Sequence, residues 1–230
     1  MPAVQLTNVD FQIITDEIRF SSVIRKFVMD AVAETDNDGV RQENIKRILD
    51  SAERLFRHYG YSKTTVADIA KDLGMSTANI YRFFGSKTEI HQALANRMLG
   101  AAYGLAAETA ALPVSATERL RLHAHQQYRL TLETMFDEEK VHEMVIVAIE
   151  REWHVIERHI DRLNDLLATV IEEGVRTGEF KVDDAQEAAK CFGASIVMLC
   201  HPQLIQQCLN KENRAKPDDL IEFALRALKA

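Results

Sequence analysis

The sequence predicts an all-helical protein, on three observations. The 230 residues include only four prolines and nine glycines, so long stretches lack residues that interrupt helices. Apolar residues recur at intervals of three and four along most of the chain, and few segments alternate as strands do. With 47% hydrophobic residues the chain can bury a sizeable core, either as one large domain or as a small domain joined to a larger one.

The first 40 residues are predicted to be an N-terminal extension and linker, with disorder and an artefactual start among the open interpretations. Val9, Phe11 and Ile13 alternate, and the sequence DNDG at residues 36–39 predicts a linker before the first long helix. Two explanations stay open. Translation starts at Met29, or the extension is an arm that packs on the rest of the protein.

The first helix is predicted over residues 41–58. Its apolar positions recur at spacings of three and four, which gives one apolar face, and Gly60 can end it. That face contains Ile45, Ile48, Leu49, Ala52, Leu55 and Phe56.

Two short helices follow. Thr65, with Asp68 three residues later, is typical of a capping box that begins the second helix, and Gly74 in a left-handed conformation ends it. Ser76 can cap a third helix that runs to about residue 84. Two short helices joined by a tight turn and packed on a longer first helix form a helix-turn-helix.

A long fourth helix begins after Gly85. Ser86 and Glu89 form a second predicted capping box, and apolar residues continue through Ile90, Leu94, Met98 and on towards Leu105. This helix leaves the helix-turn-helix and enters the second half of the chain.

The residues around the turn are of types that bind DNA. Thr65 and Lys87 lie at helix N-termini and can contact phosphates, although Thr65 can equally be a plain N-cap. Tyr81 can add a phosphate contact through its hydroxyl. Four residues of the third helix can contact base edges: arginine pairs with guanine, asparagine with adenine, and methyl groups with thymine. They are Thr77, Ala78, Asn79 and Arg82.

The distribution of charge along the chain agrees with a DNA-binding role for this segment. The net charge is −7 overall, but it is −4 over residues 1–40, +4 over residues 41–100 and −7 over the remainder. The positive segment is the one that holds the helix-turn-helix, and a local basic patch is what a DNA-binding surface requires.

These motifs resemble the DNA-binding domain of the TetR/AcrR family of bacterial one-component repressors. The resemblance rests on TTVADIA at residues 64–70, the Gly74 turn, IYRFF at residues 80–84 and SKTEI at residues 86–90, and it covers residues 41 to about 101. It implies a DNA-binding domain over 41–101 and a helical regulatory and dimerisation domain over 102–230. At the position of Thr77 this family often has a longer side chain, and an N-terminal extension of 40 residues is a departure from its pattern.

The regulatory domain is predicted to be a helical bundle. Ser115 and Glu118 begin one helix, which ends near residue 136, and a second covers residues 138–149. A long amphipathic helix starts at residue 153 and ends at Gly178. Asp183 or Asp184 caps the next helix, which runs to residue 200, and shorter helices cover residues 203–210 and 218–228.

Residues 188–209 are unusually rich in small and apolar side chains. Such a segment is either central core or half of a dimer interface, and Ala194 and Ile196 are its test positions. The family resemblance implies the interface, because the last two long helices of such proteins pair with their copies in a four-helix bundle.

A ligand cavity is expected between the helices of this domain. Its candidate lining residues are polar or aromatic groups and methionines, each of which can also be ordinary core or surface. These candidates are His123, His125, Tyr128, Met144, Trp153 and Met198. Because the domain lacks a dense basic cluster, an apolar or aromatic small molecule is favoured over a phosphorylated one.

Other classes of function are disfavoured. Residues 139–142 hold a single Glu-x-x-His, half of what a helical di-iron site needs, and we expect neither a metal nor a cofactor. Three cysteines clustered near the C-terminus do not suit a disulfide framework. No catalytic motif is present, and no apolar run approaches the roughly 20 residues that span a membrane, so we expect a cytoplasmic protein that is not an enzyme.

The sequence therefore predicts a homodimeric DNA-binding regulator, more specifically a repressor that binds a palindromic operator and responds to a small molecule. The alternative is a helical protein that sequesters a ligand or binds a partner and has lost specific DNA binding. Retained Tyr81 and Lys87 and the positive segment argue against that alternative.

Overall fold

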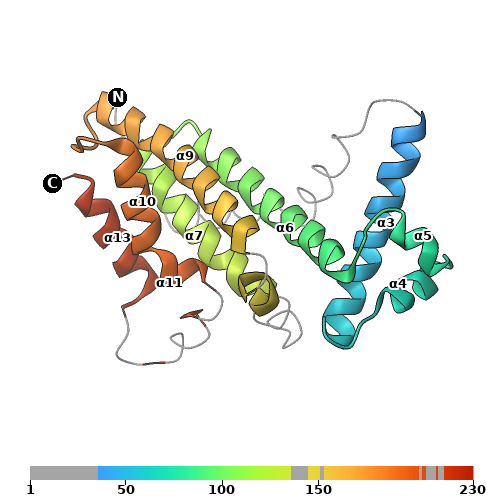
Figure 1. Cartoon of the computed structure of the whole chain (residues 1–230). Coiled ribbons are helices and arrows are strands. Elements are labelled where there is room, and N and C mark those ends of the chain that lie inside the picture. The colour runs from blue at the N-terminus through green and yellow to red at the C-terminus, as the bar shows by residue number, and fades with distance from the viewer. Residues whose placement is uncertain are drawn as a thin grey trace. The chain divides into compact units, whose positions relative to one another are not determined.

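The computed structural model describes residues 36–135, 145–150, 153–201, 204–205, 211 and 215–229, and the regular structure of these residues is helical (Figure 1). This confirms the predicted fold class, a helix-turn-helix domain followed by a larger helical domain. The helices are α3 (Asp36–Tyr59), α4 (Val66–Asp72), α5 (Thr77–Tyr81), α6 (Lys87–Ala110), α7 (Ala116–Met135), α9 (Trp153–Thr177), α10 (Ala185–Ser195), α11 (Val197–Cys200) and α13 (Pro217–Ala227).

The helix-turn-helix forms as its capping residues predict. Thr65 caps α4 in a complete capping box with Asp68, and Ser76 caps α5 by accepting a hydrogen bond from the amide of Asn79 at 3.2 Å. Gly74, between the two helices, has a φ of 65°, a conformation that costs a residue with a side chain more than it costs glycine. Helix α5 is shorter than predicted and ends at Tyr81, with Arg82 as its C-cap.

Helix α3 starts earlier than the sequence suggested. The predicted linker at residues 36–39 is instead the beginning of the helix. Aspartates in a first helical turn interact favourably with the positive end of the helix dipole, so a sequence typical of a turn can also begin a helix.

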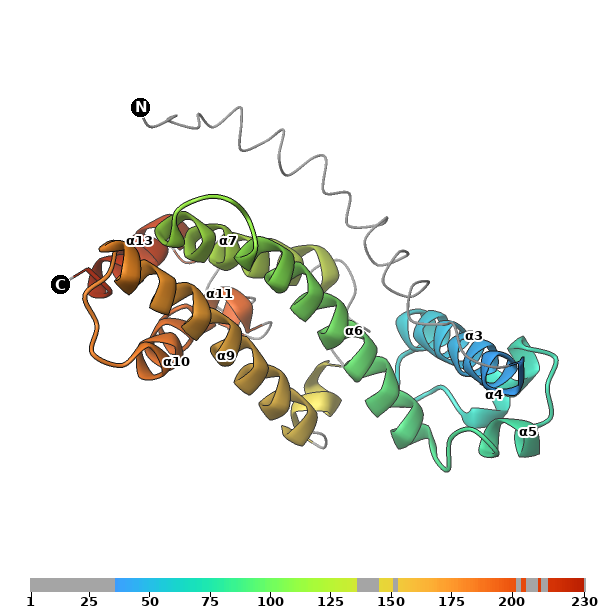
Figure 2. The ribbon, with the colours of Figure 1, turned by 90° about the horizontal axis from the view of Figure 1, so that it is seen from above.

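Helix α6 runs without a break through the predicted domain boundary at residue 101 (Figure 2). Its N-cap, Ser86, accepts from the amide of Glu89 at 3.1 Å, as predicted. The reciprocal bond differs from a standard capping box, because the Glu89 carboxylate accepts from the amide of Gly85 at 2.7 Å. Further along, α6 packs against α7 and α9.

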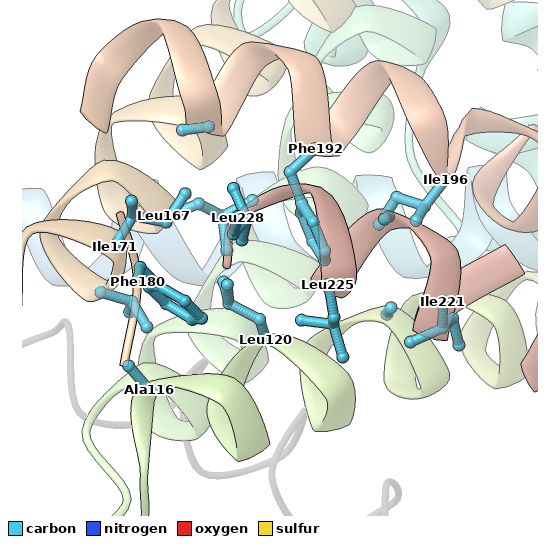
Figure 3. Close-up of a cluster of buried hydrophobic side chains, with 14 of the residues drawn as sticks. Ala116, Leu120, Leu167, Ile171, Phe180, Phe192, Ile196, Ile221, Leu225 and Leu228 are labelled. Atoms are coloured by element: carbon cyan, nitrogen blue, oxygen red, sulfur yellow. The ribbon is translucent and has the colours of Figure 1, made fainter. Parts of the chain in front are cut away.

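The core of the regulatory domain lies between α7, α9, α10 and α13 (Figure 3). Its apolar side chains come from every one of these helices, with Leu120 on α7, Ile171 on α9 and Leu225 on α13 all at most 1% exposed. Glu179 closes the first turn of α7, since its carboxylate accepts from the amides of Ala116 at 3.0 Å and Thr117 at 2.9 Å. Gly178, with a φ of 80°, ends α9 where the sequence predicted.

The helix predicted to run to residue 200 is interrupted. Asp184 caps α10 through the amides of Gln186 and Glu187, but α10 ends at Ser195 and the short α11 begins at Val197. The Ser195 hydroxyl donates to the carbonyl of Cys191 at 2.8 Å, an i−4 bond that is often found where helices bend. The predicted final helix is α13, which begins at Pro217.

Several predicted features lie outside the described residues. They are the N-terminal extension before residue 36, most of the helix predicted over 138–149, most of that over 203–210, and Met144. Within the described part, no helix combines the length and apolar character that crossing a membrane requires.

Candidate nucleic-acid interface

Helix α5 presents one buried side chain and a row of exposed ones. Ile80 is fully buried and anchors the helix, and Phe84 just beyond it is 8% exposed. On the outer side, Ala78 and Arg82 are exposed, and Tyr81 is 51% exposed although it is a large aromatic residue. Thr77 and Asn79 are half-buried at the edges of this row. The five predicted contact residues of this helix region thus lie around a rigidly held element, with Ala78, Tyr81 and Arg82 most accessible.

Thr65 acts as a helix cap. Its hydroxyl lies 2.7 Å from the Asp68 carboxylate and 3.2 Å from the Asp68 amide, and the Thr65 amide donates to the same carboxylate at 2.8 Å. The hydrogen bonds from Thr65 hold the pKa of Asp68 below its usual value. A phosphate contact by Thr65 stays a prediction. Thr65 is exposed, but its hydroxyl already forms the hydrogen bonds of the helix cap.

Lys87 joins two helix N-termini. Its ammonium donates to the carbonyls of Tyr61 at 2.9 Å and Thr64 at 3.1 Å, and it lies 4.2 Å from the centre of the Tyr61 ring. Because Thr64 immediately precedes the N-cap of α4, while Lys87 is the first residue of α6, these bonds place the two N-termini side by side. Lys87 therefore has a structural role that the sequence did not indicate.

Acidic side chains next to this surface are paired. Asp72 accepts from the Ser51 hydroxyl at 2.6 Å and from Arg54 at 2.5 Å, and the hydrogen bond from Ser51 is the main cause that lowers its pKa. Arg97 on α6 bridges Asp50 and Glu53 on α3, at 2.6 Å each. These contacts fix α4 and α6 on α3, which is what holds α5 in place.

Comparison with known proteins agrees with this arrangement. Residues 48–94 match the family model described as bacterial regulatory proteins of the tetR family, and residues 116–221 match the tetracyclin repressor-like C-terminal domain. The two models match both halves of the chain. This protein belongs to the TetR/AcrR family of transcriptional regulators.

Individual members of the TetR/AcrR family are similar over most of their length. The regulator TtgR of Pseudomonas putida is 29% identical over 166 residues, which is 67% of this chain and 77% of TtgR. A TetR/AcrR regulator from Thermobifida fusca has a TM-score of 0.58 at 24% identity, covering 81% of this chain and 96% of its own. A proposed transcriptional regulator from Saccharomonospora viridis, solved in complex with choline, has a TM-score of 0.55 at 24% identity over 79% of this chain and 93% of its own.

The structure describes the side chains of four predicted ligand residues of this TetR/AcrR regulator, His123, His125, Tyr128 and Met198, and their role in a ligand site stays a prediction. His123 is 4% exposed, whereas His125 is half-buried and lies 3.7 Å from Asp218 on α13. Two residues apart on a helix, the two histidines point in nearly opposite directions and have different surroundings. Tyr128 packs against the apolar core, and Met198 is half-buried on α11. Trp153 begins α9, but its side chain is outside the described part.

The two predicted interface residues also separate. Ala194 is exposed on α10, whereas Ile196 is 2% exposed and belongs to the core of its own subunit. The subunit alone thus matches the core alternative at Ile196, while the dimer interface stays a prediction. A groove of about 320 Å³ lies between α10 and α13, lined mainly by apolar and small residues that include Ala188, Cys191, Ser195, Ala224 and Ala227.

The cysteines that the structure describes are unpaired thiols. Cys191 is exposed and Cys200 is half-buried. Burial raises the pKa of the Cys200 thiol to about 12, so it stays protonated near neutral pH. Over the described ranges, no group of three or more histidine, cysteine or acidic side chains could hold a metal ion.

Proposed function

We propose that this TetR/AcrR regulator is a ligand-responsive repressor that binds a palindromic operator as a homodimer. The observation that carries the proposal is α5, where buried Ile80 fixes a helix whose outer side exposes Ala78, Tyr81 and Arg82. A recognition helix needs this combination, because side chains reach base edges reliably only from a helix that is held in place. The protein would act in the cytoplasm, where its operator is.

Arg82 is the residue we assign to base recognition, and Lys87 and Tyr81 to the DNA backbone. Arg82 is exposed at the C-cap of α5, and an arginine can bind guanine through two hydrogen bonds. Lys87 lies where the N-termini of α4 and α6 meet, a position at which a phosphate would be attracted by helix dipoles and by the ammonium.

We expect Arg82→Ala and Lys87→Met to affect DNA binding in different ways. An operator would first be selected from a random DNA library with the wild-type protein. Arg82→Ala should lose about 1 to 3 kcal/mol per half-site and relax the preference at one base pair. Lys87→Met should weaken binding to all sequences alike and reduce the slope of log affinity against log salt concentration by about one per contact.

The structure adds a control to this experiment. Methionine keeps a long apolar stem on Tyr61 but removes both bonds to carbonyl oxygens, so the melting temperature of Lys87→Met must be measured alongside its DNA binding. Lys63 is exposed on the loop before α4 and serves as the control. Lys63→Met removes a nearby positive charge but keeps the bonds from Lys87 to the two carbonyls, so it shows the effect of charge alone on DNA binding. Selection of no operator by the wild-type protein would contradict the proposal.

The dimer interface that we propose is the face formed by α10 and α13. Cys191, Ala194 and Ser195 are exposed there, and small side chains let two helices approach closely. Phe223 on α13 is 65% exposed, which is unusual for an aromatic residue in a single subunit. A second copy that packs against these helices in a four-helix arrangement would cover the apolar groove between them.

Ala194→Glu should therefore give a folded monomer. Because Ala194 is exposed in the subunit, the new carboxylate costs the fold little, but in a dimer it would be buried without a partner. Sedimentation gives the mass and circular dichroism the helicity. Thr169→Glu, at an exposed position of α9, is the control and should remain dimeric. An undiminished dimer for Ala194→Glu would remove α10 from the interface.

Control by a ligand would pass through α6. This helix begins in the DNA-binding domain and packs further along against α7 and α9, so a change between those helices can shift the DNA-binding domain. In a dimer the two recognition helices must match the roughly 34 to 36 Å repeat of successive major grooves, or a multiple of it. A ligand that favours another spacing releases the operator. The choline complex of the neighbour from Saccharomonospora viridis supports a small-molecule site in a domain of this fold.

A further inference from the structure

One side of α7 carries buried polar side chains at four-residue intervals. His123 is 4% exposed, and Gln127 and Thr131 are each 8% exposed. A spacing of four residues places neighbouring side chains on the same side of a helix. Leu120 and Ala124, in the neighbouring row of the same helix, belong to the apolar core. We call His123, Gln127 and Thr131 the polar stripe of α7.

The polar stripe faces polar groups of two other elements. The Thr131 hydroxyl lies 3.3 Å from the carbonyl oxygen of Cys200, which ends α11 and precedes His201. Burial, with a smaller contribution from His159 on α9, lowers the pKa of His123. The polar stripe thus has the end of α11 beside Thr131 and His159 of α9 in the neighbourhood of His123.

Three nitrogen atoms of this set have no hydrogen-bond partner in the part of the chain that the structure describes. They are Nδ1 of His123, Nε2 of Gln127 and Nδ1 of His201, and all three atoms are buried. More than nine in ten buried polar groups of native proteins are paired, because a buried group without a partner loses its hydration and gains nothing. Two of them, on His123 and Gln127, lie one helical turn apart in the polar stripe, where a bound molecule with a hydrogen-bonding group would supply the missing partners.

The electrostatic surroundings restrict what the guest can be. The charged group that acts on the His159 ring is the guanidinium of Arg162, which itself lies 4.0 Å from the centre of the Tyr103 ring. Burial is the main cause that lowers the pKa of both His123 and His159 to about 4, so both imidazoles are neutral near pH 7. Positive charge next to neutral rings does not favour a cation. The Gln127 amide nitrogen can only donate, so its partner must be an acceptor.

We propose that the polar stripe of α7 binds the effector through an oxygen atom, and that the effector is a small organic molecule with a carbonyl, carboxylate or phenolic oxygen. Gln127 Nε2 donates to that oxygen, and the His123 ring forms a second hydrogen bond. This proposal rests on the proposed function in one respect: the molecule that binds at the polar stripe is taken to be the one that controls DNA binding. It adds a polar group to the apolar or aromatic effector that the sequence favours.

The first test needs no ligand. Gln127→Leu removes an amide nitrogen that lacks a partner among the described residues, so the ligand-free protein should keep or raise its melting temperature. The neighbouring Gln126 is the matched control, because its side-chain oxygen accepts from the Thr109 hydroxyl at 3.0 Å and Gln126→Leu should lower the melting temperature. An equal loss in both variants would show that Gln127 has a structural partner and would overturn the proposal.

The second test uses matched probes on the full-length protein. Benzoate carries an anionic oxygen, benzamide a neutral carbonyl oxygen and phenol a phenolic oxygen, whereas toluene is an apolar ring without oxygen. Binding of the four probes is compared by thermal shift and calorimetry. We expect at least one oxygen-bearing probe to bind more tightly than toluene, and to lose about tenfold or more in affinity in Gln127→Leu. Equal binding of toluene, an unchanged affinity in the variant, or no binding of any oxygen-bearing probe would overturn the proposal.

Operator binding by the same protein separates the two proposals. If an operator is selected but the probes behave identically in the wild type and Gln127→Leu, only the effector class is wrong. If a probe binds through Gln127 but no operator is selected, the ligand site stands and the proposed repressor function fails.

Discussion

Gly174→Ala is expected to destabilise the regulatory domain strongly. Gly174 lies in α9, and a Cβ atom at this position would overlap the Phe180 ring, with Cε2 only 2.5 Å away, and would come within 3.0 Å of the Cβ of Ala116. Phe180 is 4% exposed and lies among Ala116, Leu120 and Ile171, so its ring cannot move aside without displacing them (Figure 3). Overpacking of this kind costs about 1 to 3 kcal/mol, or more where the neighbours are rigid.

Gly100→Ala is the matched control for this substitution. Gly100 lies inside α6, and no described atom would come within 4 Å of its added Cβ. Alanine in a helix is more favourable than glycine by about 1 kcal/mol at most, so Gly100→Ala should be neutral or stabilising. Urea denaturation of the two variants, at one protein concentration, gives the difference. If Gly174→Ala unfolds at the same urea concentration as Gly100→Ala, α9 and the Phe180 turn do not pack as described.

Local features were predicted well because their causes are local. The caps of α4, α5, α6 and α7 depend on a serine or threonine and on an amide three residues away, so the sequence alone identifies them. The same is true of the glycines that end helices, at Gly74 and Gly178. The resemblance to the TetR/AcrR family extended these local predictions to a whole domain, and the family matches confirm the assignment.

Features that depend on distant residues were missed. Lys87 was predicted to contact phosphate, but its bonds to Tyr61 and Thr64 join segments more than 20 residues apart in the sequence, and composition gives no sign of them. His123 and His125 were grouped because both are histidines close in sequence, although the helical period separates them. The sequence does contain a signal for the polar stripe, the four-residue spacing of His123, Gln127 and Thr131. That signal could be interpreted only once the structure showed which faces of α7 are buried.

Interface and core were likewise difficult to separate from sequence. Residues 188–209 are small and apolar, a composition that suits either role. The break after Ser195 decides between neighbouring positions, because Ala194 remains exposed while Ile196 turns into the core. One substitution in each place now has a distinct expected outcome, a folded monomer for Ala194→Glu and loss of folding for Ile196→Asp, whose charge would be buried without a partner.

Acid should destabilise this protein before its carboxylates are protonated, because of His123. Burial, with a further contribution from His159, lowers the pKa of His123 from 6.5 to about 4. In the unfolded chain this histidine binds a proton as the pH falls through 6.5, while in the folded chain it stays neutral until about pH 4. The unfolded state thus gains protons first, and the free energy of unfolding falls with the pH across that window.

The size of the effect makes it measurable. From the two pKa values, His123 alone should remove about 2 kcal/mol between about pH 7 and about pH 5, and its contribution should level off near pH 4. His159, whose pKa is also lowered to about 4 by burial and by Arg162, adds to the loss in the same window. His123→Phe keeps a ring of similar size and should flatten the pH dependence, whereas His154→Gln, at an exposed position of α9, should not change it. Urea denaturation at a series of pH values provides the test, and parallel curves for the wild type and His123→Phe would mean that this imidazole is not held neutral between α7 and α9.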